Sequence, residues 1–153
     1  MQAVVVANGE IHHEEPALRE MQPDALIVCA DGGTTNALTL GLTPNVIIGD
    51  MDSMDPALLH ELEAAGTQLI VHPSHKDESD TELALRYCVE QGAREILLLG
   101  ALGGRLDHML ANLLLLADTT WQGTPLRIVD GGTRIEMCTA RCEIYGAAGD
   151  IVS

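Results

Sequence analysis

Short apolar runs alternate along the chain with longer segments whose apolar positions recur at helical spacing. The runs predict six strands, at residues 2–7, 25–30, 45–49, 67–71, 95–100 and 125–130. Most of these runs are too continuously apolar for a strand with one face in water, which is typical of a parallel sheet covered on both faces. The pattern therefore predicts an α/β fold with a doubly wound, mostly parallel sheet and helices on both faces.

The segments between the strands predict five helices, at residues 14–21, 34–40, 56–65, 80–91 and 106–117. Residues typical of helix ends support these assignments. Pro56 follows Asp55 as a first-turn proline, and Ser79 with Glu82 predicts a capping box at the start of the fourth helix. Three glycines stand where helices are expected to stop, at Gly41, Gly66 and Gly92.

The pattern changes after Asp130, where glycines divide short apolar runs and no helical segment follows. This segment is typical of the start of an all-β element, but two or three strands cannot cover their own edges. We therefore expect an α/β domain over residues 1–130 and an incomplete β domain over residues 131–153. Either the chain is a fragment, or the last strands pair with the first domain or with a partner.

Composition excludes several classes of protein. With 46% hydrophobic residues among 153, the chain can bury a core without disulfides or metal, which excludes disorder over most of its length. Its 8 basic and 23 acidic residues give a net charge of −15, which opposes binding to nucleic acid. An anionic ligand therefore needs divalent cations, backbone amides or a few well-placed basic groups.

The terminus and the cysteines favour a cytoplasmic protein. The first residues lack the basic flank of a signal peptide, and no apolar run is long enough for a membrane span. The cysteines lack the spacing of a disulfide framework, and Cys138 and Cys142 lack the nearby histidines of a zinc site. We expect reduced, buried thiols at Cys29, Cys88, Cys138 and Cys142.

Polar and glycine-rich clusters follow four consecutive predicted strands, at residues 31–33, 49–53, 75–80 and 100–108. Ligands bind beyond the carboxyl ends of the strands in an open parallel sheet, so the clusters are expected to meet at one edge. Asp50 and Asp52 follow the third strand, and Asp80 can join them from the next loop. Grouped carboxylates suit Mg²⁺. The alternative is that Asp52 and Ser53 only build a turn.

Basic groups near these clusters are candidates for binding an anion. Residues 100–105 lead from a strand into a helix, so their backbone N–H groups and Arg105 form a candidate anion site. They do not form a P-loop, because no Gly-Lys-Ser/Thr follows. Lys76, the only lysine, either offsets phosphate charge or is an ordinary loop lysine.

Three further polar residues allow more than one interpretation. Ser79 is better explained as a helix cap than as a catalytic group. Asp107 can hold Arg105, contact a metal or stabilise the first turn of the last helix. The role of His108, which follows Asp107, is equally open.

Four sequence blocks together resemble the thiamine pyrophosphokinase family. They are ADGGTTNAL at 30–38, GDMDS at 49–53, HKDESDTELAL at 75–85 and GALGGRLDHMLAN at 100–112. The resemblance implies Mg²⁺-dependent transfer of a diphosphoryl group from ATP to the hydroxyethyl oxygen of thiamine. The products would be thiamine diphosphate and AMP.

The resemblance also implies roles for individual residues. Asp50, Asp52 and Asp80 resemble the metal-binding carboxylates, and Asp77 resembles a supporting acid. Ser79 stands where the family commonly has threonine, which keeps the hydroxyl. The candidate nucleotide and phosphate contacts are Asp31, Gly32, Gly33, Asn36, Lys76, Ser79, Gly103, Gly104, Arg105, Asp107 and His108.

The implied reaction asks little covalent chemistry of the protein. The alcohol attacks the β-phosphorus in line, while Mg²⁺ and Arg105 balance the charge that develops on the phosphate oxygens. No nucleophilic serine or cysteine is needed. Asp77 and Asp80 are both candidates for accepting the alcohol proton.

The end of the chain leaves alternatives open. In the family a C-terminal β domain follows and, through a homodimer, builds much of the thiamine pocket. Here that domain would begin near Gly131 and stop at Ser153. The alternatives are a diphosphokinase for another alcohol, such as 6-hydroxymethylpterin, and a non-catalytic nucleotide-binding module.

Overall fold

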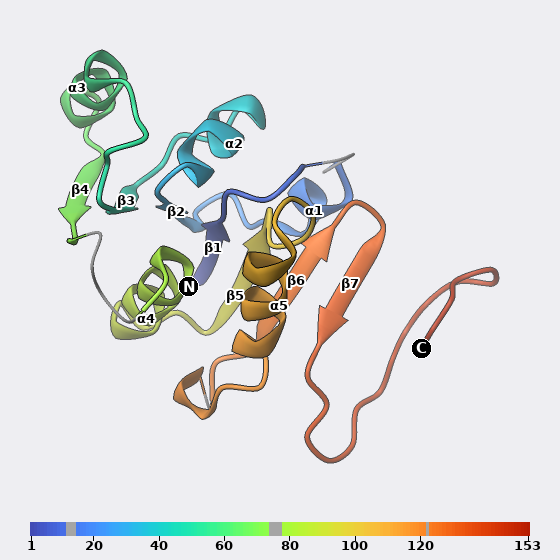
Figure 1. The fold of residues 1–153 in the computed structure, drawn as a ribbon. Helices are drawn as coiled ribbons and strands as arrows, with labels where there is room; N and C mark the ends of the chain where they lie inside the picture. The colour runs from blue at the N-terminus through green and yellow to red at the C-terminus, as the bar shows by residue number, and fades with distance from the viewer. Residues whose placement is uncertain (12–14, 74–77, 122) are drawn as a thin grey trace.

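A computed structural model describes residues 1–11, 15–73, 78–121 and 123–153. These residues form a seven-stranded sheet in the order β4-β3-β2-β1-β5-β6-β7, with helices on both sides (Figure 1). The strands are β1 (Gln2–Val6), β2 (Leu26–Ala30), β3 (Val46–Gly49), β4 (Gln68–Val71), β5 (Glu95–Leu99), β6 (Leu126–Asp130) and β7 (Thr133–Glu136). The predicted α/β fold is confirmed.

The sheet is parallel except at one edge. Strands β1 to β6 pair in parallel, and β7 pairs antiparallel to β6. Val4 in β1 lies opposite Ile27 in β2 on one side and Leu97 in β5 on the other. The strand order therefore reverses at β1, and this reversal is where open α/β sheets bind ligands.

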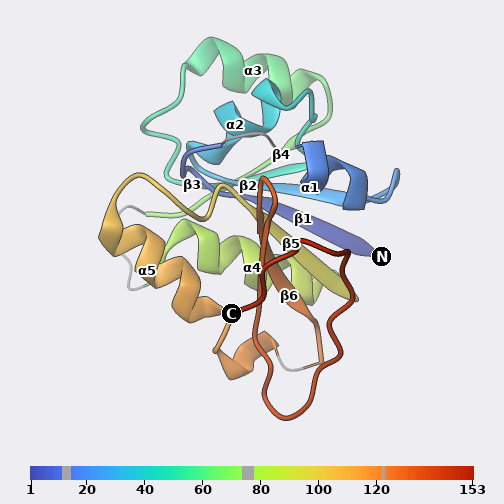
Figure 2. The same cartoon turned by 90° about the vertical axis from the view of Figure 1, so that its right-hand side faces the viewer.

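Two apolar layers cover the sheet because consecutive residues of the central strands point to opposite faces. Val4 belongs to the layer formed with α1 (Glu15–Glu20), α2 (Gly33–Thr39) and α3 (Pro56–Ala64). Val5 belongs to the layer formed with α4 (Asp80–Glu90) and the end of α5 (Leu106–Leu115). Both valines are fully buried, which explains the continuous apolar runs. Figure 2 shows α1 to α3 on one side of the sheet and α4 and α5 on the other.

The helices begin and end close to the predicted positions. They are α1 (Glu15–Glu20), α2 (Gly33–Thr39), α3 (Pro56–Ala64), α4 (Asp80–Glu90) and α5 (Leu106–Leu115), followed by a 3₁₀ turn at Thr119–Trp121. Asp55 caps α3 by accepting a 2.9 Å hydrogen bond from the Ala57 N–H. Ser79 caps α4 by accepting a 3.1 Å hydrogen bond from the Glu82 N–H. None of the helices described is long and apolar enough to cross a membrane.

Part of the predicted C-terminal β segment extends the first sheet. The β7 strand is tied to β6 and α1 by a charged network in which Arg127 and Arg134 contact Glu20, and Arg127 also contacts Glu136. Residues 137–153 form no helix or strand and are exposed. The division into two domains at residue 130 stays a prediction.

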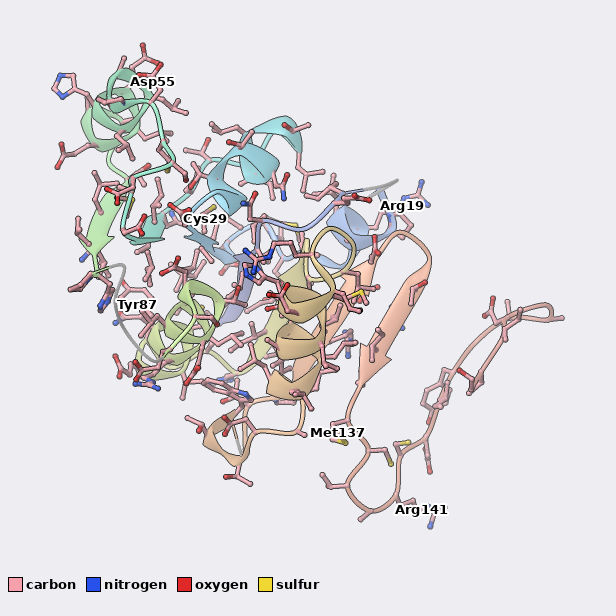
Figure 3. All side chains as sticks on the ribbon, in the orientation of Figure 1. Arg19, Cys29, Asp55, Tyr87, Met137 and Arg141 are labelled. Atoms are coloured by element: carbon pink, nitrogen blue, oxygen red, sulfur yellow. The ribbon has the colours of Figure 1, made fainter. Side chains whose placement is uncertain are left out.

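The prediction of buried thiols holds for two of the four cysteines. Cys29 and Cys88 are buried in the two apolar layers, and burial raises the pKa of each thiol to about 12. Cys138 and Cys142 are exposed, so the prediction is wrong for them. They lie in the segment after β7, which also carries Met137 and Arg141 and extends away from the sheet (Figure 3).

Candidate functional site

A cavity of about 390 Å³ lies where the carboxyl ends of β1, β2 and β5 meet the first turns of α4 and α5. It is located at the reversal of strand order, as expected for an open parallel sheet. Its wall is formed by Ala7, Asn8, Gly9, Ala30, Asp31, Ser79, Asp80, Thr81, Ala101, Gly103, Gly104, Arg105, His108, Met109, Ala111 and Asn112. The predicted clusters at residues 31–33, 75–80 and 100–108 therefore contribute described residues to one site.

Asp31 contributes a carboxylate from the end of β2. It has a positive φ of 43°, which is uncommon outside glycine. Its Oδ2 accepts a 2.9 Å hydrogen bond from Ser53 Oγ. Its Oδ1 is buried without a hydrogen-bond partner in the described structure. A buried carboxylate oxygen in this state favours a ligand that supplies a positive charge or a donor.

Asp80 contributes a second carboxylate to the cavity from the first residue of α4. The neighbouring Ser79 has the capping role that the sequence favoured, and it also lies in the wall of the cavity. Asp77 and Lys76, which were predicted to act nearby, lie outside the described residues. Their roles stay predictions.

Asp50 and Asp52 lie in a turn after β3. Asp50 Oδ1 accepts a 3.0 Å hydrogen bond from the Asp52 N–H, and Met51 between them has a φ of 62°. Neither aspartate belongs to the described cavity wall. The bond within the loop agrees with the alternative that Asp52 and Ser53 build a turn. Ser53 also links this loop to Asp31. The role of Asp50 and Asp52 in metal binding stays a prediction.

The donor set of the cavity fits a magnesium ion bound partly by its substrate. Asp31 and Asp80 supply two carboxylates, and the unpartnered Asp31 Oδ1 is a hard oxygen donor. Mg²⁺ commonly binds one or two carboxylates and completes its shell with water and phosphate oxygens. Within the described part of the chain, no group of three or more His, Cys, Asp or Glu side chains is placed to hold a metal alone.

The loop between β5 and α5 supplies glycines and one arginine. Gly103 and Gly104 have φ values of 74° and 65°, in the left-handed region that glycine adopts without a steric penalty. A Cβ atom added to Gly104 would meet nothing within 4 Å, so the glycine requirement there is conformational. These glycines lead into the start of α5, whose first N–H groups lack partners within the helix.

Arg105 is paired with Asp107 beside the cavity. Arg105 Nη2 lies 2.6 Å from Asp107 Oδ2, and Nε donates to Oδ1 at 3.1 Å. The hydrogen bond from Arg105 is the main reason that the pKa of Asp107 falls to about 2. Of the three interpretations of Asp107, the structure therefore supports holding Arg105. His108 lies in the same wall.

Asn36 supports the site from outside the cavity wall. Its side-chain amide donates hydrogen bonds of 2.8 and 2.9 Å to the carbonyl oxygens of Ala7 and Gly9. It thereby fixes the loop after β1 against α2. Gly33 is needed for the same packing, since an added Cβ would lie 2.0 Å from the Val6 carbonyl oxygen. Neither residue is part of the wall, and neither is Gly32.

The loop after β1 was missed by sequence reasoning. Asn8 and Gly9 line the cavity, although no polar cluster was assigned to this first strand end. The signal was present in the sequence, because Asn8 and Gly9 directly follow an apolar strand and ligands bind beyond the carboxyl ends of the strands in open α/β sheets. Asn112 was missed because it lies inside a helix, where its side chain donates to the Ala101 carbonyl oxygen at 3.0 Å.

Comparison with known proteins identifies one family. The sequence profile described as "Thiamin pyrophosphokinase, catalytic domain" matches residues 18–135. Thiamine pyrophosphokinase of Bacillus subtilis (strain 168) is 33% identical over 112 residues, which cover 73% of this chain and 52% of the relative. Thiamine pyrophosphokinase 1 of Oryza sativa subsp. japonica is 30% identical over 132 residues, with coverage of 72% and 49%. The chain spans about half the length of these curated relatives.

Solved structures of similar proteins have the same fold. The crystal structure of thiamine pyrophosphokinase from Bacillus subtilis superposes with a TM-score of 0.73 at 27% identity, covering 89% of this chain and 63% of that chain. The structure of thiamin pyrophosphokinase from Geobacillus thermodenitrificans gives a TM-score of 0.66 at 36% identity, covering 85% and 60%. Both similarities cover most of this chain.

Proposed function

Because the chain belongs to the thiamin pyrophosphokinase family, we propose that it carries the nucleotide-binding and catalytic part of an enzyme that transfers a diphosphoryl group from ATP to thiamine. The observation that carries this proposal is the single cavity shared by Asp31, Asp80 and Arg105. Two carboxylates and a guanidinium at one opening suit a nucleoside triphosphate that binds together with a divalent cation. All three residues lie within the matched range of the family profile.

In this proposal the residues position and balance charge. Asp31 and Asp80 would hold the cation against the phosphates, and Mg²⁺, when bound, would neutralise part of the phosphate charge. Arg105 would exchange its bond with Asp107 for phosphate oxygens, where its planar guanidinium can donate two parallel hydrogen bonds. The N–H groups at the start of α5 would support the same anion. Asp80 and Asp77 remain candidates for accepting the alcohol proton.

The proposal also includes the assembly and location implied by the family resemblance, namely a cytoplasmic homodimer. Light scattering after size exclusion measures the assembly directly, because two chains of 16.3 kDa would double the mass of the particle. A mass of one chain at all concentrations would contradict the homodimer.

The activity is tested with the purified chain, ATP, Mg²⁺ and either thiamine or 6-hydroxymethylpterin as acceptor. We expect AMP and thiamine diphosphate to appear with thiamine, and Arg105→Ala to abolish most of their formation. Arg141→Ala is the matched control, because Arg141 lies in the exposed segment after β7. AMP formation with the pterin alone would overturn the choice of acceptor. Nucleotide binding without AMP formation under either condition would favour the non-catalytic alternative.

A further inference from the structure

Ser53 connects two loops that follow neighbouring strands of the sheet. Its hydroxyl donates to Asp31 Oδ2 at 2.9 Å, across 22 residues of sequence. Asp31 follows β2 and lines the cavity, whereas Ser53 follows β3 and is not part of the cavity wall. Among the described contacts, the hydrogen bond to Asp31 is what links Ser53 to the cavity.

The backbone of Asp31 is held from several sides. Its N–H donates to the Ile48 carbonyl oxygen at 2.9 Å, and its own carbonyl oxygen accepts from the N–H and the hydroxyl of Thr34 at 3.0 and 2.9 Å. A Cβ atom added to Gly49 would lie 2.8 Å from the Asp31 Cβ, so the backbone at the end of β3 packs closely against the Asp31 side chain. With the backbone fixed at positive φ, the main freedom left to Asp31 is rotation of its carboxylate.

The hydrogen bond from Ser53 removes that freedom and distinguishes the two carboxylate oxygens. Oδ2 is satisfied by the serine hydroxyl, while Oδ1 is buried without a partner in the described structure. A buried oxygen without a partner lowers the stability of the fold, because it has lost its hydrogen bonds to water. A ligand that contacts this oxygen recovers part of that free energy, which favours binding. The carboxylate thus has one oxygen held by Ser53 and one oxygen whose contacts are not satisfied by the described residues.

We propose that Ser53 is a positioning residue that orients the Asp31 carboxylate so that Oδ1 binds the cation that accompanies the phosphates of a nucleotide. The identity of that ligand rests on the proposed function. Partners that orient a metal-binding side chain contribute strongly to affinity although they never touch the metal. Ser53 is accordingly expected to affect cation and nucleotide affinity more than stability.

The test measures Mn²⁺ binding by electron paramagnetic resonance, with a non-hydrolysable ATP analogue present, on the full chain. We expect Ser53→Ala to weaken Mn²⁺ binding by about 10-fold to 100-fold, the range typical of such orienting partners. Ser53→Thr keeps the hydroxyl and is expected to restore binding to within about 3-fold of the original chain. Thr39→Ala is the control, because it removes an exposed hydroxyl that donates to the Thr35 carbonyl oxygen on the outer part of α2.

A double-mutant cycle separates positioning from a general effect on folding. If Ser53 acts through Asp31, then Ser53→Ala causes no further loss of Mn²⁺ affinity in a chain that already carries Asp31→Ala. Additive losses, or an unchanged affinity in Ser53→Ala alone, would overturn the inference. Equal losses of Mn²⁺ affinity in Ser53→Ala and Ser53→Thr would also overturn the inference.

The same measurement distinguishes failure of this inference from failure of the proposed function. If the original chain binds neither Mn²⁺ nor the ATP analogue, the proposed function fails and the role of Ser53 fails with it. If the original chain binds both and Ser53→Ala binds them equally well, only the role of Ser53 is overturned. Thermal unfolding of each variant confirms that the compared chains are folded.

Discussion

Arg105 donates two hydrogen bonds to the carboxylate of Asp107, two residues further along the chain. The basic group of the candidate anion site is therefore already paired with an acid before a ligand arrives. Both side chains are well exposed, at 71% and 64%, so water weakens the pair and a phosphate group can displace the carboxylate. The two hydrogen bonds orient the Arg105 guanidinium beside the cavity before a ligand binds.

Replacing Arg105 by lysine tests whether the planar guanidinium matters. Lysine keeps the charge but cannot donate two parallel hydrogen bonds to a phosphate, so we expect nucleotide affinity to fall about tenfold. Isothermal titration calorimetry with a non-hydrolysable ATP analogue and Mg²⁺ measures the change. Arg141→Lys provides the control, because Arg141 is 88% exposed and contacts Glu143 in the last segment. If Arg105→Lys binds the ATP analogue as tightly as the original chain, no contact of Arg105 depends on its planar guanidinium.

The pairing also predicts how Asp107 responds to pH. The hydrogen bond from Arg105 lowers the pKa of Asp107 from 3.8 to about 2, so the ionised form is favoured in the folded chain. Its contribution to stability is therefore present above pH 3.8 and is lost as the pH falls toward 2. Carboxyl carbon shifts followed by NMR measure this pKa. We expect Arg105→Ala to return the pKa toward 3.8, and an unchanged low value would contradict the pairing.

Thiol reactivity should divide the four cysteines into two classes. Burial raises the pKa of Cys29 and Cys88 to about 12, so neither forms a reactive thiolate near neutral pH. Cys138 and Cys142 are exposed and open to reagents. We expect Ellman's reagent to modify two thiols in the folded chain and all four after unfolding in guanidinium. Cys138→Ser with Cys142→Ser should leave the folded chain unreactive, and rapid labelling of that variant would contradict the buried positions.

The charged network at the edge of the sheet is expected to hold β7 in place. Arg127 is 27% exposed and contacts Glu20 and Glu136, so its removal takes one partner from each acid and leaves Glu20 with Arg134 alone. Arg127→Gln should lower the free energy of unfolding by roughly 1–2 kcal/mol, measured by urea denaturation. Hydrogen exchange should show the largest loss of protection in β7. Arg141→Gln is the matched control, and equal effects of the two variants would contradict the role of the network.

Local chemistry was enough to place the helices and the six parallel strands of this fold, but not the pairing of β7 with β6. Each central strand is buried on both faces, so its apolar run is visible in the sequence without knowledge of its neighbours. The same is true of the caps at Asp55 and Ser79, since a cap acts within a few residues of its own position. The clusters that follow β2 and β5 were recognisable because parallel strands bring their carboxyl ends to one edge.

Tertiary structure decided which polar residues face the cavity and which only support it. Asn36 binds the loop after β1, while its predicted contact with a nucleotide stays a prediction, and Ser53 donates to one oxygen of Asp31 from the loop after the neighbouring strand. Neither pairing has a sequence signal, because the partners are 27 to 29 and 22 residues apart and meet only when the sheet assembles. The exposure of Cys138 and Cys142 was likewise invisible to composition, because burial depends on what packs against a segment. The sequence by itself thus determined the elements and the edge where polar groups gather, while folding assigned each group its partner.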